Sequence, residues 1–258
     1  MKKWALITGA SQGIGYEFTK LFAADGYNLV LVARDQARLK QVADEIGARF
    51  GIVAKIIPKD LTARTAPKEI FDELQTDKIQ IDVLINNAGF GFQGAFSELE
   101  LQRHLDLIQV NMTALVELTY LFLKPMLVRR EGRILNVAST AAFQPGPYMA
   151  MYYASKAFVY SFSCALAEEL SGTGVTATTL NPGITRSQFH GRAGLQRSKG
   201  FAIMEAEEVA KIGYRALMNG KPNVTAGLIN KLSSSIAKAL PTRLTTRIAA
   251  RLNKHDDR

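Results

Sequence analysis

The sequence predicts one α/β domain, doubly wound, with a parallel sheet between two layers of helices. Short runs rich in Val, Ile and Leu recur along the chain, and each is bounded by Gly, Asn, Asp or Pro, as buried strands are. Segments of helix length separate these runs. Because such alternation produces right-handed βαβ units, we expect parallel strands with helices covering both faces of the sheet.

The expected elements follow one another in a regular order. The predicted strands are residues 4–7, 28–33, 51–57, 81–85, 133–138 and 175–180. Helical patterns between them include 14–24 and 36–48, and the long stretch 101–130 is expected to form two helices. The length of 258 residues fits one large domain of this class, since no linker or repeat divides it.

The composition excludes several classes of protein. The single cysteine, Cys164, rules out an internal disulfide and a multi-thiolate metal site, and no metal site is predicted. The first apolar stretch, 4–7, is shorter than the roughly 7 to 15 residues of a signal peptide core. No run approaches the roughly 18 uninterrupted apolar residues of a membrane-spanning helix. We therefore expect a cytoplasmic protein.

The net charge of +9 is concentrated in the C-terminal third. Residues 1–184 carry 18 basic and 18 acidic side chains, whereas residues 185–200 carry four basic and no acidic ones. The last 39 residues carry eight basic and two acidic side chains. No nucleic-acid recognition motif accompanies this charge, so nucleic-acid binding is not expected.

A glycine-rich stretch, LITGASQGIG at 6–15, ends the first predicted strand and opens the first predicted helix. Its glycines, Gly9, Gly13 and Gly15, would let a pyrophosphate approach the backbone closely. The amide groups and dipole of the helix N-terminus would attract the same anion. Taken alone, the pattern also fits a tight turn that binds no ligand.

The end of the second strand bears on the choice of cofactor. An acid there would bind the ribose 2′-hydroxyl of NAD, and an arginine would bind the 2′-phosphate of NADP. Ala33 stands where the acid is expected and Arg34 follows it, which favours NADP. Arg38 could assist or be a solvated helix charge, and Asp35 leaves NAD open as the alternative.

Polar side chains follow two further strands at the edge where ligands bind in such sheets. Asn86 and Asn87 could form a turn, or could hold the strand edges and line the adenosine side of a cofactor. Ser139 and Thr140 leave the next strand at the same edge. This edge is therefore the expected position of the site.

The stretch YYASK at 152–156 places two tyrosines ahead of a lysine. In a helix, Lys156 shares a face with both Tyr152 and Tyr153, so spacing alone does not choose between them. A phenol has a pKa of about 10, and a neighbouring ammonium plus a positively charged nicotinamide would lower it toward the range of a general acid or base. Simple packing of both rings is the alternative.

Together, these motifs resemble those of the short-chain dehydrogenases/reductases, whose domain is of the Rossmann type. The resemblance runs from Lys3 to about Phe189, and in that family the acid/base tyrosine has the i,i+4 relation to the lysine, which selects Tyr152. The motifs that carry it are TGASQGIG (8–15), Asp60, NNAG (86–89), Asn111, Ser139, Tyr152 with Lys156, and NPG (181–183).

The resemblance implies a role for each matched residue. Ser139 would steady the substrate carbonyl, Tyr152 would donate the proton, Lys156 would hold the nicotinamide ribose and lower the pKa of the phenol, and Asn111 would complete a proton relay through water. Asp60 would contact the adenine. The implied cofactor-binding residues are Gly9, Ser11, Gln12, Gly13, Ile14, Gly15, Arg34, Asp60, Leu61, Asn87, Ala88, Gly89, Tyr152, Lys156, Pro182 and Gly183.

The predicted reaction is NADPH-dependent reduction of a small-molecule carbonyl, with a 3-oxoacyl thioester or another apolar ketone as substrate. The narrower similarity is to a bacterial branch of DltE-type oxidoreductases and 3-oxoacyl reductases. A mobile loop at about 185–200, with Thr185 or Ser187 as a contact, would close over the substrate, and its cations would attract an acidic one. The expected pocket residues are Phe90, Phe92, Phe143, Met149 and Phe189, with packing in the core as the alternative for the aromatic ones.

We place the NADP-binding catalytic domain at 1–220, including that loop, and a basic C-terminal extension packed on it at 221–258. The extension has apolar residues at helical spacing among basic ones, interrupted by Pro241. It could pack on the body or on a sister subunit of a homodimer or homotetramer. The alternative is a protein that binds a membrane surface or a partner and keeps only a vestigial reductase site.

Overall fold

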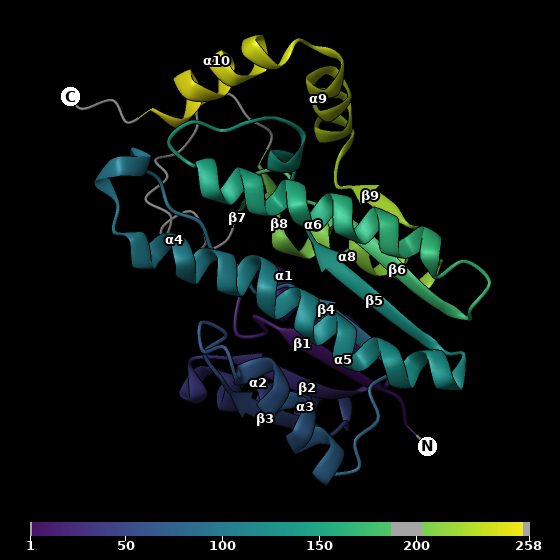
Figure 1. The fold of residues 1–258 in the computed structure, drawn as a ribbon. Helices are drawn as coiled ribbons and strands as arrows, with labels where there is room; N and C mark the ends of the chain where they lie inside the picture. The colour runs from purple at the N-terminus through teal and green to yellow at the C-terminus, as the bar shows by residue number, and fades with distance from the viewer. Residues whose placement is uncertain (1, 187–202, 255–258) are drawn as a thin grey trace.

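The computed structural model describes residues 2–186 and 203–254, and its centre is a parallel sheet in the strand order β3-β2-β1-β4-β5-β6-β9 (Figure 1). All six pairings between neighbouring strands are parallel, which confirms the predicted fold class. The strands are β1 (Trp4–Thr8), β2 (Asn28–Ala33), β3 (Ala54–Pro58), β4 (Val83–Asn86), β5 (Gly132–Val137), β6 (Val175–Asn181) and β9 (Asn223–Thr225).

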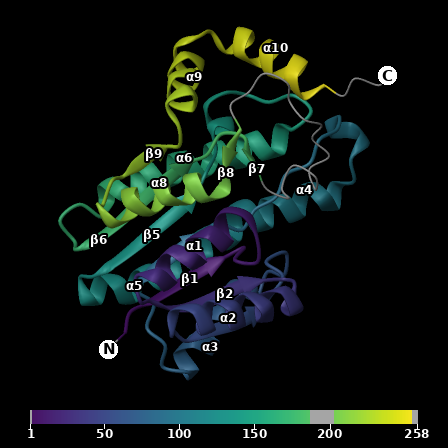
Figure 2. The same ribbon diagram turned by 180° about the vertical axis from the view of Figure 1, so that it is seen from behind.

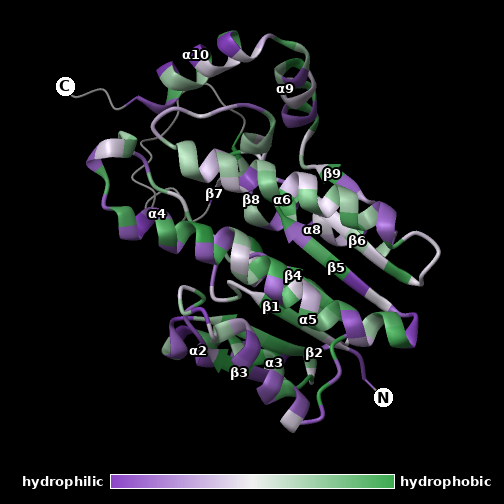
Figure 3. Ribbon diagram, in the orientation of Figure 1, coloured by the Kyte–Doolittle hydropathy of each residue, from purple (hydrophilic) through white to green (hydrophobic). Residues whose placement is uncertain are grey.

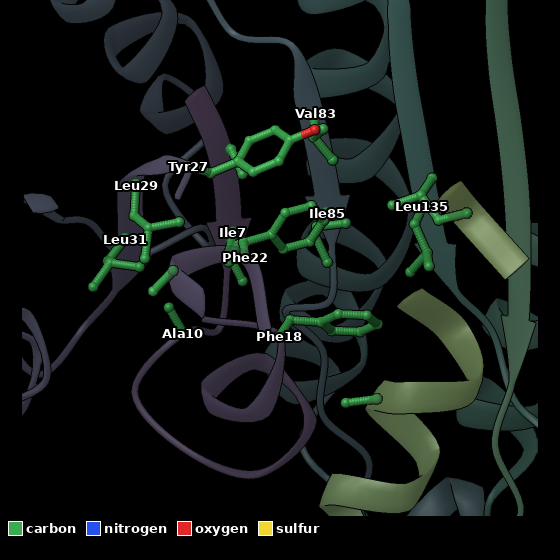
Figure 4. Packing of buried hydrophobic residues seen from close by; sticks show 14 of the residues in the cluster. Ile7, Ala10, Phe18, Phe22, Tyr27, Leu29, Leu31, Val83, Ile85 and Leu135 are labelled. Carbon is green, nitrogen blue, oxygen red and sulfur yellow. The ribbon is translucent and has the colours of Figure 1, made fainter. Parts of the chain in front are cut away.

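Two layers of helices cover the sheet (Figures 1 and 2). One face is packed by α1 (Gly13–Ala24), α2 (Gln36–Phe50) and α8 (Ala206–Met218). The other is packed by α3 (Ala66–Thr76), α5 (Ala114–Arg129) and α6 (Ala150–Glu169). In the first layer Phe18 and Phe22 of α1 lie over Ile7, Ile85 and Leu135 of the sheet (Figure 4). Their complete burial is the main anchor of that layer.

The long stretch predicted as two helices is a single helical run with a π-turn inside it. α4 (Leu101–Ile108) continues through η2 (Gln109–Thr113), a π-helix, into α5. The run Leu101–Arg129 is long and apolar enough to cross a membrane by composition, although no uninterrupted apolar run marks it. In the structure Leu118, Phe122 and Met126 pack in the core beside the sheet, whereas Leu101, Tyr120 and Val128 are exposed.

The C-terminal residues contribute to the sheet as well as to a separate pair of helices. β9, inside the predicted extension 221–258, is the edge strand beside β6. It leads into α9 (Leu228–Ala239) and α10 (Thr242–Asn253), which lie at one end of the molecule beyond α6 (Figures 1 and 2). A short second sheet pairs β7 (Thr185–Arg186) with β8 (Met204–Glu205). Residues 187–200 of the predicted loop lie outside the described residues.

A buried polar network links the middle of the sheet to α5 and α6 of the second layer. The Asn86 side chain donates to Asn136 Oδ1 at 2.9 Å and to Thr119 Oγ1 of α5 at 3.0 Å. Asn136 donates in turn to Ser163 Oγ of α6 at 2.9 Å. Since all four side chains are buried, each depends on the others for its hydrogen bonds.

Replacing Asn136 by Ala should therefore lower the free energy of unfolding by about 1–3 kcal/mol, because the donor of Asn86 and the hydroxyl of Ser163 lose their buried partner. Urea unfolding measures the change. The matched control is Asn219→Ala, at an exposed helix end, which should shift stability by less than about 0.5 kcal/mol. Equal effects of the two substitutions would contradict this assignment.

Candidate active site

One large pocket opens at the carboxyl edge of the sheet and has a cavity volume of about 1090 Å³. Its walls come from the segments that follow β1, β2, β3, β4, β5 and β6, and from α9 and α10. This volume lies at the upper end of the range for small-molecule sites, as a dinucleotide plus a substrate requires. All sixteen predicted cofactor-binding residues except Gly15 line it.

The glycine-rich turn forms a cradle in which each glycine has a conformational or steric reason. Gly9 and Gly13 have left-handed backbones, with φ of 67° and 56°. A Cβ on Gly15 would lie 2.2 Å from the Gly9 carbonyl oxygen, so this glycine allows α1 to begin directly against the turn. Gly15 therefore permits this close packing without lining the pocket itself. The turn and the α1 N-terminus fit the pyrophosphate of a dinucleotide.

The end of the pocket beside β2 and β3 carries the residues expected to choose the cofactor. Arg34 lines it, with Nη1 3.8 Å from a carboxylate oxygen of Asp60, and both side chains are largely exposed. Arg38 also lines it, lying over the Tyr16 ring and donating to the Ser11 carbonyl at 3.3 Å. The Asp35 carboxylate caps α2 by accepting from the Arg38 amide at 2.9 Å. That bond accounts for Asp35 as a helix cap, and Arg34, Arg38 and Lys59 all line this end of the pocket.

The loop after β4 is tied to the end of β1. Thr8 Oγ1 accepts from the amides of Asn87 and Ala88 at 3.0 and 2.9 Å, and the Asn87 side chain donates to the Thr8 carbonyl at 2.9 Å. Of the two asparagines, Asn86 therefore belongs to the buried network, and Asn87 holds the strand edges and lines the pocket.

Ser139, Tyr152 and Lys156 come together at the centre of the pocket. Ser139 caps the short helix η3 (Thr140–Phe143), and its hydroxyl accepts from the Ala141 amide at 3.1 Å and interacts with Tyr152. Lys156 Nζ lies 5.8 Å from the centre of the Tyr152 ring and donates to the Val137 carbonyl at 2.9 Å. Both helical positions place their side chains on one face of α6, as the i,i+4 spacing predicts.

Burial sets the protonation of this pair. It raises the pKa of Tyr152 to about 12, against the opposing effect of the hydrogen bond with Ser139. It lowers the pKa of Lys156 to about 8, because the ammonium is buried without a carboxylate. The expected lowering of the phenol pKa by Lys156 is therefore not seen in the protein alone, where desolvation dominates. The phenol is protonated at neutral pH.

Asn111 sits in the π-turn, below the loop after β4. Its side chain accepts from the Phe90 amide at 3.0 Å and donates to the Phe90 carbonyl at 2.9 Å and to Ser155 Oγ at 3.1 Å. It also lies under Gly89, where a Cβ would approach it to 3.1 Å. The side-chain amide group is thus used to hold the loop after β4, and Asn111 does not line the pocket.

Tyr153 belongs to the substrate wall of the pocket. Its ring packs where a Cβ on Gly146 would stand, and its hydroxyl lies 3.5 Å from Asn253 Oδ1. Asn253 of α10 also donates to the Pro147 carbonyl at 3.1 Å, and its own carbonyl accepts from Gln93. Sequence reasoning missed Asn253 and Gln93, since no motif marks a contact between segments 160 residues apart.

The expected apolar lining is partly wrong. Phe90 and Met149 line the pocket, but Phe92 is buried against His104, and Phe143 packs on Tyr160 beneath Lys238. Thr185 lines the pocket, and its hydroxyl donates to the Gly183 carbonyl at 3.1 Å. Phe189 and Ser187 lie outside the described residues.

The fold and the site define a class: a dinucleotide-binding α/β domain with a serine, a tyrosine and a lysine at the carboxyl edge of its sheet. Residues 3–198 match the model of the short chain dehydrogenase family, and the chain belongs to that family.

Known proteins resemble the chain over different lengths. The 17-beta-hydroxysteroid dehydrogenase type 3 of Mus musculus is 38% identical over 70% of the chain, which spans 60% of the length of that protein. A very-long-chain 3-oxoacyl-CoA reductase of Bos taurus is 31% identical over 96% of the chain and 78% of its own length. A solved structure of a short-chain dehydrogenase from Sphingobium yanoikuyae in complex with NADPH has a TM-score of 0.84 and 30% identity, covering 99% of each chain.

The lowered pKa of Lys156 gives a prediction about stability. Between pH 8 and 10.5 the unfolded chain holds one more proton than the folded one, so stability rises with pH across that window. Below it the buried ammonium costs the folded state about 3 kcal/mol. Lys156→Met should stabilise the protein by about 2 kcal/mol at pH 7, once the lost hydrogen bond to Val137 is counted.

Urea unfolding at pH 7 and pH 10 measures this difference, which should shrink at the higher pH. Lys40→Met, at an exposed lysine, is the matched control and should change stability little at either pH. A variant no more stable than wild type at pH 7, or a gain independent of pH, would show that burial does not disfavour this ammonium.

Proposed function

We propose that the protein is an NADPH-dependent carbonyl reductase whose substrate is an apolar ketone, with a 3-oxoacyl thioester as the favoured class. The observation that carries the proposal is the grouping of Ser139, Tyr152 and Lys156 inside a pocket large enough for a dinucleotide and a substrate. The intact grouping also argues against a vestigial site.

Bound NADPH would supply the hydride to the carbonyl carbon. Ser139 is placed to donate to the substrate oxygen, where negative charge develops. Tyr152, whose raised pKa keeps it protonated, delivers its proton to that oxygen. Lys156 stands behind the ring with one bond fixed on Val137, so its remaining donors are available to a ribose and to a proton relay that restores the phenol.

The preference for NADPH is supported by Arg34 and Arg38, which both line the end of the pocket where a 2′-phosphate would lie. The cap made by Asp35 weakens the NAD alternative. The similar structure from Sphingobium yanoikuyae, which holds NADPH, supports the same choice.

The substrate class is supported by the relatives and by the composition of the pocket. The Bos taurus relative is a very-long-chain 3-oxoacyl-CoA reductase, and the mouse relative acts on steroids according to its name. Both imply a large apolar substrate. The narrower placement in a bacterial DltE-type branch, the cytoplasmic location and the homo-oligomeric state remain predictions from the sequence.

A panel of carbonyl substrates tests the proposal. With NADPH, 3-oxoacyl thioesters and steroid ketones should be reduced with higher kcat/KM than short ketones or sugars. If the loop cations favour a phosphate-bearing thioester, its KM should rise with salt while that of a neutral ketone stays constant. Failure of NADPH to be oxidised with every member of the panel would contradict the proposed function.

The two adjacent tyrosines should behave differently. Tyr152→Phe removes the proton donor and should lower kcat by about 10² to 10⁴. Tyr153→Phe removes only the long contact with Asn253 and should change KM more than kcat. Steady-state kinetics with one ketone measures both, and similar losses of kcat in the two variants would show that the assignment to Tyr152 is wrong.

Cofactor selectivity should depend on the arginines. Arg34→Ser should lower kcat/KM for NADPH by about tenfold or more, through the loss of a charge-assisted contact, and leave that for NADH nearly unchanged. Arg64→Ser, at an exposed arginine outside the pocket, is the control. A parallel loss with both cofactors would place Arg34 away from the 2′-phosphate.

A further inference from the structure

The two C-terminal helices present their polar faces to the body of the protein. In α10 the buried row is Thr245, Ala249 and Asn253, and in α9 the buried residue is Ser234. Asn230, Ser234 and Asn253 line the pocket, which explains why polar groups face inward here. Helices on the surface of a soluble domain ordinarily show the opposite arrangement.

The apolar residues of both helices consequently face outward. Seven of them are 45% to 85% exposed, and they follow the helical repeat along both helices: Leu228, Ile229, Leu232, Ile236, Leu244, Ile248 and Leu252. Leu252, at the end of this row, also borders the pocket. We call this the α9–α10 outer face. Figure 3 shows apolar segments on both helices, and Figures 1 and 2 place these helices at the end of the molecule.

The charge around this outer face has one sign. Residues 228–254 include six basic side chains and no acidic one: Lys231, Lys238, Arg243, Arg247, Arg251 and Lys254. Lys238 lies over the Phe143 and Tyr160 rings and Lys254 lines the pocket, whereas Lys231 and the three arginines are exposed. The three arginines form a row along α10, next to the row of Leu244, Ile248 and Leu252. None of the six forms an ion pair with an acidic residue in the described part of the chain.

The exposed apolar residues and the positive charge beside them together favour one kind of binding partner. A second copy of the chain placed symmetrically would bring cations against cations, with no acid between them to compensate. An acidic, water-soluble protein would match the charge but would leave the apolar row uncovered. An anionic lipid bilayer satisfies both, because its headgroups attract the cations while its hydrocarbon boundary receives the leucines and isoleucines.

We propose that the α9–α10 outer face binds the surface of an anionic lipid bilayer, with both helices lying in the interfacial plane. Their inner faces form a wall of the pocket, so the mouth of the pocket would lie beside the lipid. An apolar substrate of the class proposed above could then enter from the membrane. The binding itself does not depend on that proposed reaction.

Co-sedimentation with vesicles tests the proposal without any turnover. The protein should bind vesicles of equal parts phosphatidylcholine and phosphatidylglycerol, should bind pure phosphatidylcholine much more weakly, and should be released by added salt. Arg243→Gln/Arg247→Gln/Arg251→Gln should lower the partition coefficient on the order of 10²-fold. The corresponding triple Lys variant keeps the charges and should retain binding.

The apolar part is tested separately. Leu232→Gln/Ile236→Gln should lower partitioning about tenfold or more, since both side chains would leave the hydrocarbon boundary. The matched controls are Val53→Gln/Val128→Gln and Lys40→Gln/Arg64→Gln/Lys78→Gln, at exposed sites distant in sequence. Thermal unfolding of each variant checks that the fold is retained.

Three results would overturn the proposal. The first is no binding to anionic vesicles, and the second is equal losses in the controls. The third is that the wild-type protein does not bind vesicles but forms a dimer, and that Leu232→Gln/Ile236→Gln dissociates this dimer in sedimentation velocity. The outer face would then be covered by a second copy of the chain. Loss of NADPH oxidation with intact vesicle binding would count only against the proposed reaction.

Discussion

The hydroxyl of Thr8 holds together the edge of the sheet on which the site is built. It donates to the Ile85 carbonyl and accepts from the amides of Asn87 and Ala88, so the end of β1 and the loop after β4 cannot separate. The glycine turn follows one of these segments, and the loop that rests on Asn111 follows the other. A parallel sheet brings strand ends to one edge, and this hydroxyl fixes how the loops leave that edge.

The two sides of the pocket are held in place by different parts of the fold. The cofactor cradle and Lys156 depend on hydrogen bonds to strands, such as those from the Gly9 amide to the Val32 carbonyl and from Lys156 to the Val137 carbonyl. The substrate wall instead depends on Asn253, which bridges Gln93, Pro147 and Tyr153 from α10. The sheet therefore positions Lys156, and the C-terminal helices form the opposite wall of the pocket, where we propose that the substrate binds.

The sequence predicts the side of the pocket next to the sheet far better than the side formed by the C-terminal helices. Strand 28–33 is found where predicted, and the Ser139, Tyr152 and Lys156 grouping follows from strand ends and helical spacing, which are local properties. The edge strand β9 was missed because its three residues show no apolar run. The π-turn at Asn111 and the wall made by Asn253 arise from tertiary contacts. Phe92 and Phe143 were misplaced because buried positions and pocket walls favour the same residue types.

The inverted polarity of α9 and α10 has a consequence for how such an enzyme can diversify. Most of their inward side chains are short and polar, whereas Gly9 and Gly15 of the cradle have no room for a Cβ. A substitution at an inward position such as Ser234, whose buried hydroxyl forms no hydrogen bond within the described residues, would reshape this wall without touching the cradle. Natural selection could therefore alter what the protein recognises while the machinery that handles the cofactor stays the same.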